Sequence, residues 1–384
     1  MANKTLEDTF IGLKTFFDKH SFPGFALAVG RGGEIIYSAA DGYADPATND
    51  AMTPATRIRL GSLSKVFTTA CILKLKQDGL LSYDDRLIKH FPKCLESSGN
   101  PVDERALQIT IRHILTHTSG LPIDVPKLMP YMGKDDSLKI YDHPDNLNYR
   151  SICNLLYNSK LLFDPGTRYG YSTVSFLVLG RIIERLSGQQ FFTYLHNSIF
   201  NPNGVEGISR GRTCGGDLNE AAYYNIDPLD GGEPVRETQF SFGPTRHLEC
   251  RDSSGGLISS PEALVQAMMR FYEISGANVF DLATRADLVS LPDSETNERP
   301  ETYVGLGWWV RRAPGFDQER NADPLYQTRL YHTGRTSGAV NSLFRGENGV
   351  WAAVQANCGV TDHDWPSLQD QIYAIMAPRI RCLH

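Results

Sequence analysis

The chain has 384 residues, of which 41% are hydrophobic and 21% charged, and its formal net charge is −6 at pH 7. This composition is typical of a globular protein and argues against long disordered segments. The acidic balance, without any run of Lys and Arg, argues against a dedicated nucleic-acid binder. The seven cysteines are widely spaced and form no Cys-x-x-Cys pair, so neither a disulfide scaffold nor a zinc site is expected.

The N-terminal twenty residues are amphipathic and lack the apolar core of a signal peptide. No apolar stretch approaches the roughly 20 residues that cross a bilayer. We therefore expect a cytoplasmic protein with no membrane partner.

The N-terminal part predicts a helix, a hairpin and a second helix. Apolar residues recur at helical spacing over 6–19. Apolar runs at 25–30 and 35–38 flank a glycine-rich turn, which is typical of a β-hairpin. A short strand at 57–60 then leads into a helix at 62–77.

In the middle of the chain, the predicted helices are separated by long irregular stretches. The stretches 122–148 and 200–250 are rich in Pro, Gly, Asn and Asp, and loops of that length are usually functional or mobile. The predicted helices of this part lie at 109–117, 147–158, 174–187 and 190–197.

The C-terminal part returns to strands. A helix fits 261–273, strands fit 303–311, 338–345 and 350–357, and a terminal helix fits 366–378.

The predicted fold class is α+β, an antiparallel β-sheet flanked by helices with an inserted helical subdomain. We expect residues 1–80 and 255–384 to form one sheet domain from both chain ends. Residues 81–254 would be a helical and loop-rich insertion that covers an active site.

Ser62 and Lys65 are the first candidate catalytic pair. Residues at i and i+3 share a helix face, and a serine needs a base within hydrogen-bond reach to become a nucleophile. Gly61 allows a tight turn that sets Ser62 at the helix N-terminus, where free N–H groups and the helix dipole stabilise an oxyanion. A desolvated lysine near positive charge has a lowered pKa and can act as a base.

Two later segments add to this pair. A tyrosine in the 165–173 loop could reach the site, where a nearby lysine would favour the phenolate and allow proton relay. Gly334 in the segment 331–338 would let another backbone approach closely on a strand, although His332-Thr333-Gly334 taken alone predicts a turn.

The order of these segments resembles the serine β-lactamase and penicillin-binding-protein superfamily, nearest to its class C-like branch of β-lactamases, esterases, D-amino-acid peptidases and a statin-type transesterase. The resemblance covers nearly the whole chain. Beyond the Ser-x-x-Lys motif, the segments that carry it are Leu80–Asp85, Ile111–Pro122, Tyr171–Thr173, Ser254–Ser260 and His332–Gly334.

This resemblance implies a role for each motif. Ser62 would be the nucleophile, and Lys65 and Tyr171 would share the base and acid roles. The backbone N–H groups of Ser62 and Arg335 would form the oxyanion hole. Thr333, with its neighbours in the third motif, would contact substrate, and no cofactor or metal would be needed.

Two residues depart from the family pattern. Thr173 stands where the branch usually has an asparagine, and one hydroxyl cannot supply both an amide donor and an amide acceptor. His332 stands where true β-lactamases have a lysine, so attraction for a substrate carboxylate would be weaker, although Arg335 could restore a positive charge. Both departures favour esters or unusual acyl groups over β-lactams.

Other signals compete with this interpretation. Gly207–Gly211 fits the G-x-S-x-G elbow, but its flanks lack the required strand and helix. His113 and His117 have the spacing of a zinc helix without the H-E-x-x-H pattern, which favours structural histidines. The segment Asp142–Asp145, with His143, is typical of a solvated loop.

Several aromatic residues could line a pocket, with core packing at least as plausible for each. Trp308 and Trp309 could line an acyl pocket, but only one of two strand neighbours can face inward. The others are Tyr223, Tyr224 and Phe240.

The sequence thus predicts a serine hydrolase or acyltransferase acting through a Ser62 acyl-enzyme on an ester, thioester or amide of a small molecule, in secondary metabolism. The acceptor, water or another nucleophile, stays open. An acyl carrier protein is a further candidate partner that no sequence feature demonstrates. The alternatives are a silent binding protein or a non-hydrolytic biosynthetic enzyme on the same fold.

Overall fold

The computed structural model describes residues 2–91, 101–122, 155–156, 158–212, 216, 218–225, 234–236, 248–273, 279–292, 301–312, 323–360, 365–381 and 383. The helix predicted at 147–158 lies largely outside these residues, and so does most of the 122–148 loop.

An eight-stranded antiparallel sheet, with strand order β3-β2-β1-β13-β12-β11-β10-β9, forms the centre of the molecule. Strands β1 and β13 pair in its middle, so the two ends of the chain meet in one sheet. The strands from the N-terminal side are β1 (Gly24–Arg31), β2 (Glu34–Asp45) and β3 (Asp50–Ala51). Those from the C-terminal side are β9 (Thr302–Val304), β10 (Trp309–Arg312), β11 (Thr328–Thr336), β12 (Ala339–Arg345) and β13 (Trp351–Ala356).

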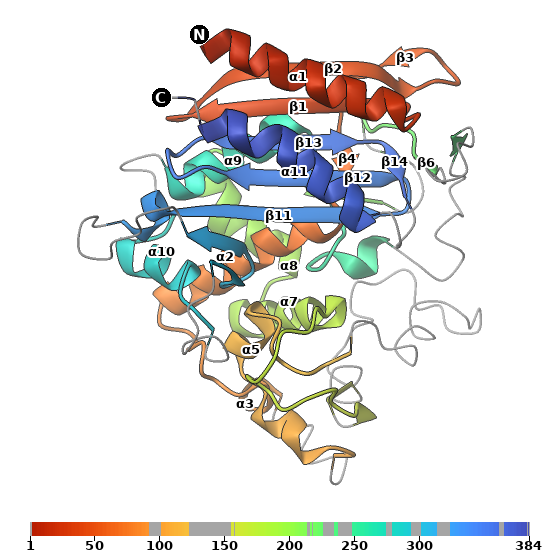
Figure 1. Cartoon of the computed structure of the whole chain (residues 1–384). Coiled ribbons are helices and arrows are strands. Elements are labelled where there is room, and N and C mark those ends of the chain that lie inside the picture. The colour runs from red at the N-terminus through yellow and green to blue at the C-terminus, as the bar shows by residue number, and fades with distance from the viewer. Residues whose placement is uncertain are drawn as a thin grey trace.

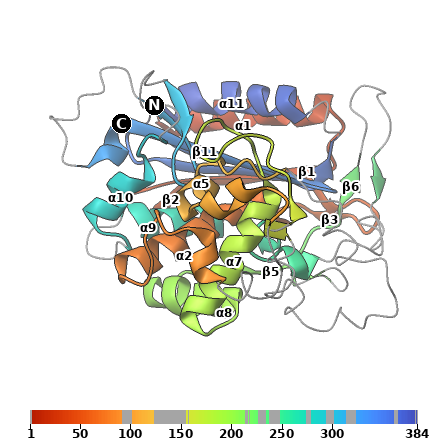
Figure 2. The same ribbon diagram turned by 90° about the horizontal axis from the view of Figure 1, so that it is seen from below.

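Helices cover both faces of this sheet. Figures 1 and 2 show α1 (Ala2–Lys19) and α11 (Trp365–Arg381) side by side on one face, with α2 (Ser64–Gln77) and α9 (Pro261–Tyr272) on the other. Strands β12 and β13 are buried at every position, as expected for strands covered on both sides. The fold class predicted from the sequence is confirmed.

Below α2 in Figure 1 lies a region built largely of short helices and loops. Its longest helix, α7 (Thr173–Ser187), packs against α2. The short helices α3 (Leu87–His90) and α5 (Ile111–Leu115) lie in the same region (Figure 1). Beside α2 lie α8 (Phe191–Leu195), with its π-type continuation His196–Phe200, and α10 (Leu282–Leu288) (Figure 1).

Two small three-stranded sheets complete the described secondary structure. One has the order β14-β6-β7 and the other β4-β8-β5. Their strands are β4 (Ile58–Arg59), β5 (Ile208–Arg210), β6 (Tyr224–Asn225), β7 (Val235–Arg236), β8 (Leu257–Ser259) and β14 (Cys358–Gly359). Single turns of 3-10 helix lie at Gly61–Leu63, Glu104–Gln108, Asn201–Asn203, Leu248–Arg251 and Pro324–Gln327.

Two local predictions are wrong. The single strand expected at 303–311 is the antiparallel pair β9 and β10, because the chain reverses through Gly307, whose φ is +73°. The turn expected for His332-Thr333-Gly334 taken alone is part of β11, a continuous strand paired with β12. Within the described residues, no helix combines the length and apolarity needed to cross a membrane.

Candidate active site

Ser62 lies in the 3-10 turn Gly61–Leu63 that leads into α2. Gly61 has φ +53°, and a Cβ at this position would come within 2.6 Å of the Arg335 carbonyl oxygen. Only glycine combines this backbone conformation with so close an approach. The turn therefore sets Ser62 directly against strand β11.

The Ser62 hydroxyl lies between two proton-carrying side chains. The Lys65 Nζ donates to the Ser62 Oγ at 3.0 Å, and the Ser62 Oγ and Tyr171 hydroxyl are 2.6 Å apart. Lys65 lies three residues on, in the first turn of α2, whereas Tyr171 is 109 residues distant in the sequence. The structure thus brings together the three residues predicted to carry the chemistry.

The Lys65 side chain is fully buried and is held by a second contact. Its Nζ donates to the Ser254 carbonyl oxygen at 2.7 Å, and Thr68 of the same helix donates to the Ser253 carbonyl oxygen at 2.6 Å. The Asp252 carboxylate accepts from Arg181 of α7 and from the Ser253 N–H. These contacts fix the direction in which the ammonium points.

Tyr171 immediately precedes Ser172, the N-cap residue of α7, whose hydroxyl accepts from the Ser175 N–H. Burial alone would raise the pKa of the Tyr171 phenol, but the Lys65 charge and hydrogen bonds from Lys65, Ser62 and Thr173 outweigh it. The pKa is lowered as a result. Because opposite charge favours ionisation, Tyr171 is suited to accept and return a proton.

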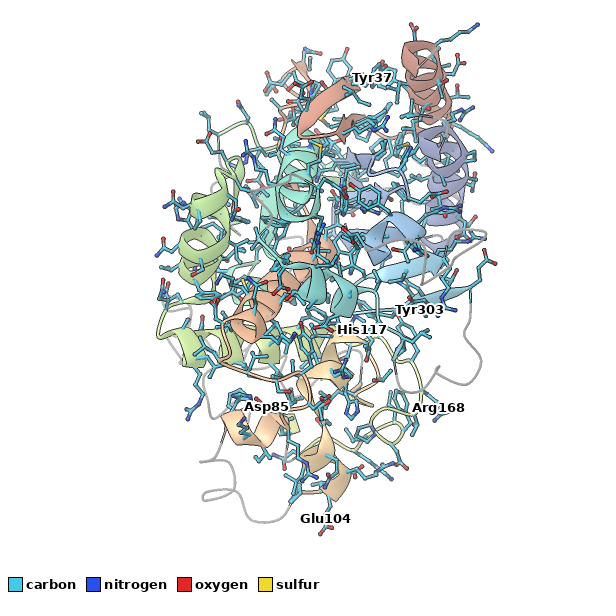
Figure 3. All side chains as sticks on the ribbon, turned by 90° about the vertical axis from the view of Figure 1, so that its left-hand side faces the viewer. Tyr37, Asp85, Glu104, His117, Arg168 and Tyr303 are labelled. Carbon is cyan, nitrogen blue, oxygen red and sulfur yellow. The ribbon has the colours of Figure 1, made fainter. Side chains whose placement is uncertain are left out.

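His117 is a site residue that sequence reasoning treated only as a structural histidine. Its carbonyl accepts from the Gly170 N–H at 2.7 Å and its Nδ1 accepts from the Ser172 N–H at 3.3 Å, so it binds both neighbours of Tyr171. Its ring lies 4.6 Å from that of Tyr171. His117 sits in the left-handed region with φ +55°, in the middle of the molecule above Asp85 in Figure 3.

Strand β11 borders the serine along its second half. Strand β10 pairs with β11 only at Thr328–Tyr331. Within the described residues, β11 therefore has no β10 neighbour from His332 onward. A Cβ on Gly334 would lie 1.9 Å from the Leu60 carbonyl oxygen, so only glycine lets the strand and the Ser62 turn touch. The Arg335 Nη1 donates to the Val360 carbonyl oxygen at 3.0 Å.

His332 is buried and neutral. Burial and the nearby Lys65 charge lower the pKa of its imidazole to about 3, despite a hydrogen bond to the Thr333 carbonyl that favours the charged form. That bond, 2.8 Å from Nδ1, requires the proton on Nδ1. The Thr333 hydroxyl donates to Gln369 of α11 at 3.4 Å. The position therefore carries no permanent positive charge.

A cavity of about 460 Å³ opens beside Ser62. Its walls come from the 169–173 loop, the β9–β10 turn, β10, β11 and α11. The lining residues are Ser62, His117, Tyr169, Tyr171, Thr173, Val304, Gly307, Trp308, Trp309, Tyr331, His332, Thr333, Arg335 and Gln369. All eight residues predicted for the site except Lys65 and Gly334, which lie behind this surface, are among them.

The competing signals do not form a second centre. Ser209 of the Gly207–Gly211 segment lies within β5 and accepts from Arg57, so it is no elbow between strand and helix. His113 is part of the capping box of α5. Among the described residues, no cluster of three His, Cys, Asp or Glu could hold a metal ion.

The aromatic candidates divide between core and cavity. Trp308 is fully buried against Trp351 and Trp309 is half-buried, and both tryptophans line the cavity. Tyr223 donates to Glu220 and Tyr224 donates to Asp45, and neither lines the cavity. Phe240 and the segment Asp142–Asp145 lie outside the described residues.

Comparison with protein families decides the assignment. A family model described as Beta-lactamase matches residues 8–375. The chain belongs to the beta-lactamase family. Family membership agrees with the resemblance seen in the sequence motifs and with the sheet-and-helix fold.

The match between this chain and its curated relatives covers only part of each relative's length. Penicillin-binding protein 4* of Bacillus subtilis (strain 168) is 34% identical over 198 residues, which cover 50% of this chain and 39% of the relative. Protein flp of Staphylococcus aureus (strain N315) is 27% identical over 56% of this chain and 40% of its own. The chain thus spans about two fifths of the length of these relatives.

Solved structures match the whole fold. EstCE1, described as a hydrolase with promiscuous acyltransferase activity, superposes with a TM-score of 0.71 at 22% identity, covering 97% of this chain and 99% of its own. D-amino acid amidase from Ochrobactrum anthropi SV3 gives 0.69 at 21% identity, with 97% and 99% coverage. At this identity the likeness establishes the fold.

Proposed function

We propose that this chain is a serine hydrolase or acyltransferase that works through an acyl-enzyme on Ser62. The observation that supports it most directly is the pair of hydrogen bonds on the Ser62 Oγ, to Lys65 at 3.0 Å and to Tyr171 at 2.6 Å. A serine hydroxyl becomes a nucleophile when a base lies within this reach.

In the first half-reaction, the Ser62 Oγ attacks the carbonyl carbon of an ester, thioester or amide while the Tyr171 phenolate, stabilised by the Lys65 ammonium, takes its proton. The backbone N–H groups of Ser62 and Arg335 stabilise the oxyanion. The bond to the leaving group breaks, and Tyr171 returns the proton to that group. In the second half-reaction, an acceptor O–H or N–H gives its proton to Tyr171 and attacks the acyl carbon. The bond between the acyl carbon and Ser62 Oγ breaks, and Tyr171 returns the proton to Oγ.

Esters are the favoured substrates. The Thr173 hydroxyl contributes a hydrogen bond to Tyr171 and cannot also present the donor and acceptor pair of an amide side chain. The neutral His332 offers less attraction for a carboxylate than an ammonium would. Both features disfavour β-lactams relative to small-molecule esters.

The same proposal extends to the biological setting. A small-molecule acyl donor points to secondary metabolism, with an acyl carrier protein thioester as a further source. Residues 81–254 would act as the cover of the site, since they supply Tyr171 and Thr173. The buried thiol of Cys71 suits a reducing, cytoplasmic compartment.

The test is hydrolysis of p-nitrophenyl acetate and butyrate together with labelling by a fluorophosphonate probe. The wild-type chain should release p-nitrophenol and carry the label on Ser62, and Ser62→Ala should do neither. Absence of both signals from folded wild-type protein contradicts the acyl-enzyme, and leaves a silent binding protein or a non-hydrolytic enzyme on this fold.

A further inference from the structure

Three aromatic side chains gather at one end of the cavity, each from a different element. The rings of Trp309 in β10 and Tyr331 in β11 stack with centroids 5.8 Å apart and planes 12° apart. The ring of Tyr169, from the loop before α7, lies 5.3 Å from Trp309. We refer to Tyr169, Trp309 and Tyr331 as the aromatic subsite.

These rings border the cavity, and Tyr331 also packs against Tyr373 at the edge of a hydrophobic cluster. All three line the same cavity as Ser62, and Tyr169 leaves 41% of its surface exposed. Ring faces that border the cavity are available to a flat ligand. Stacked or tilted contact between such a ligand and these rings would be favourable, as it is for aromatic pairs.

The position of the aromatic subsite along β11 indicates which part of a substrate it meets. The oxyanion position lies beside Arg335, and a strand rises about 3.3 Å per residue. Tyr331 is therefore about 13 Å away along the strand. Tyr169, in turn, is two residues before Tyr171, whose hydroxyl must reach the leaving-group oxygen. The closeness of Tyr169 to Tyr171 in the chain favours the leaving-group side of the scissile bond as the position of the aromatic subsite.

The charges of the residues around the cavity indicate which class of ligand the aromatic subsite can bind. Among the described residues that line the cavity, the one with a permanent charge is Arg335, which lies at the oxyanion end. The aromatic end is bordered by neutral His332, Thr333 and Gln369. In the adjoining pocket, Arg311 is paired with Glu301, and Asp370 adds a negative charge. An uncharged ring loses little by leaving water for such a site, whereas a carboxylate would lack a cationic partner.

From these contacts we propose that the aromatic subsite binds the alcohol part of the substrate, as an uncharged, planar ring system held about 13 Å from the reacting carbonyl. In hydrolysis this alcohol leaves with the proton from Tyr171. In acyl transfer from another donor, an alcohol of this class is the acceptor: its O–H proton passes to Tyr171, its oxygen bonds the acyl carbon, the bond to Ser62 Oγ breaks, and Tyr171 returns the proton to Oγ. This inference rests on the proposed acyl-enzyme function.

The experiment compares two ester series. In the first, the acyl group is butyrate and the alcohol is 2-(2-naphthyl)ethanol or 2-cyclohexylethanol, two primary alcohols of nearly equal acidity. In the second, the alcohol is ethanol and the acyl group is 3-(2-naphthyl)propanoate or 3-cyclohexylpropanoate. The wild-type kcat/KM should favour naphthyl over cyclohexyl in the first series and show little preference in the second.

Substitutions in the aromatic subsite then test whether these rings cause the naphthyl preference. Trp309→Leu should reduce the first-series preference about 2- to 12-fold, the range expected for loss of one aromatic pair, mainly through KM. Trp309→Phe should restore much of it. Tyr43→Leu, an exposed tyrosine on β2, serves as the matched control and should leave the preference unchanged. If Trp309→Leu does not fold, Tyr169→Leu replaces it, since that ring is more exposed.

Two outcomes overturn the inference. A naphthyl preference confined to the acyl series would assign the rings to the wrong side of the bond, and equal rates in both series would remove the subsite. Labelling of Ser62 by the fluorophosphonate separates these results from failure of the proposed function. Labelled wild-type protein without an alcohol preference contradicts only the aromatic subsite.

Discussion

At the scale of single residues, the site depends on how two proton carriers share one hydroxyl. Lys65 is fully buried, and its ammonium bonds both Ser62 and the Ser254 carbonyl. Its charge lowers the pKa of Tyr171 against the opposing effect of burial. Lys65 and Tyr171 thus act on Ser62 as a coupled pair. An apparent pKa measured from a pH–activity profile therefore belongs to the pair.

Removing either partner should slow acylation. Lys65→Ala and Tyr171→Phe each should reduce the rate of p-nitrophenyl butyrate acylation by about 10²-fold or more, the scale of general acid–base groups. Stopped-flow release of p-nitrophenol measures this step. Lys89→Ala, at an exposed lysine paired with Asp85, is the control. Near-wild-type rates for both site variants would require a different base.

The pH dependence of acylation should follow Tyr171. Because the phenolate is the active base and its pKa is lowered from the usual value of 10, kcat/KM should rise with pH and level off below pH 10. In Tyr171→Phe, kcat/KM should no longer show this rise with pH. An unchanged rise in the variant would assign the titration to another group.

Thr173 should control the choice between esters and amides. Thr173→Asn supplies both an amide donor and an acceptor, so the ratio of amide or β-lactam turnover to ester turnover should increase. Parallel assays with nitrocefin and p-nitrophenyl butyrate measure that ratio. Thr48→Asn, on the loop between β2 and β3, is a control. An unchanged ratio would remove the reason for preferring esters.

At the scale of elements, the site depends on the close approach of β11 to the Ser62 turn. Gly334 makes the contact possible, since a Cβ there would meet the Leu60 carbonyl oxygen at 1.9 Å and the Leu63 nitrogen at 2.9 Å. Both obstacles are backbone atoms, so a side chain cannot rotate to relieve the clash.

Gly334→Ala should therefore displace the strand from the turn. The expected loss of unfolding free energy is about 1–3 kcal/mol, as for overpacked sites, together with loss of esterase activity. Gly79→Ala is the control, because Gly79 has φ +74° and open space around it, so it carries backbone strain alone. Urea denaturation and esterase assays measure both. Full activity in Gly334→Ala would mean that the contact does not position the site.

The sequence predicted most elements but not their local reversals. Apolar periodicity located helices such as α7 (Thr173–Ser187) and strands such as β13 (Trp351–Ala356) within a few residues. It predicted one strand at 303–311 because the apolar run continues through Gly307, and nothing in the pattern shows the positive φ that reverses the chain.

At the scale of the whole molecule, catalytic side chains come from segments that only the complete fold brings together. Lys65 and the Ser254 carbonyl are 189 residues apart, and His117 meets the backbone of Ser172 across 55 residues. The motif pattern suggested Ser62, Lys65 and Tyr171, but no local pattern indicates a backbone acceptor or a histidine that holds a loop. Those contacts required the structure.

The buried histidines should make folding sensitive to acid. The pKa of His332 is about 3 in the folded chain and near 6.5 when unfolded, so below pH 6.5 the unfolded state binds more protons. Stability should then fall with decreasing pH, with a slope for this histidine that approaches about 1.4 kcal/mol per pH unit well below pH 6.5. Urea denaturation at pH 7.0 and 5.5 measures the slope, which His332→Gln should reduce. Equal slopes would mean that His332 is protonated in the folded chain.

The most direct test of the account is mass spectrometry of the protein quenched in acid within milliseconds of mixing with p-nitrophenyl butyrate. The account predicts a butyryl adduct on the peptide that contains Ser62, its accumulation in wild-type protein, and its absence in Ser62→Ala. An adduct on any other residue, or p-nitrophenol release by Ser62→Ala at the wild-type rate, would contradict the assignment of Ser62 as the nucleophile.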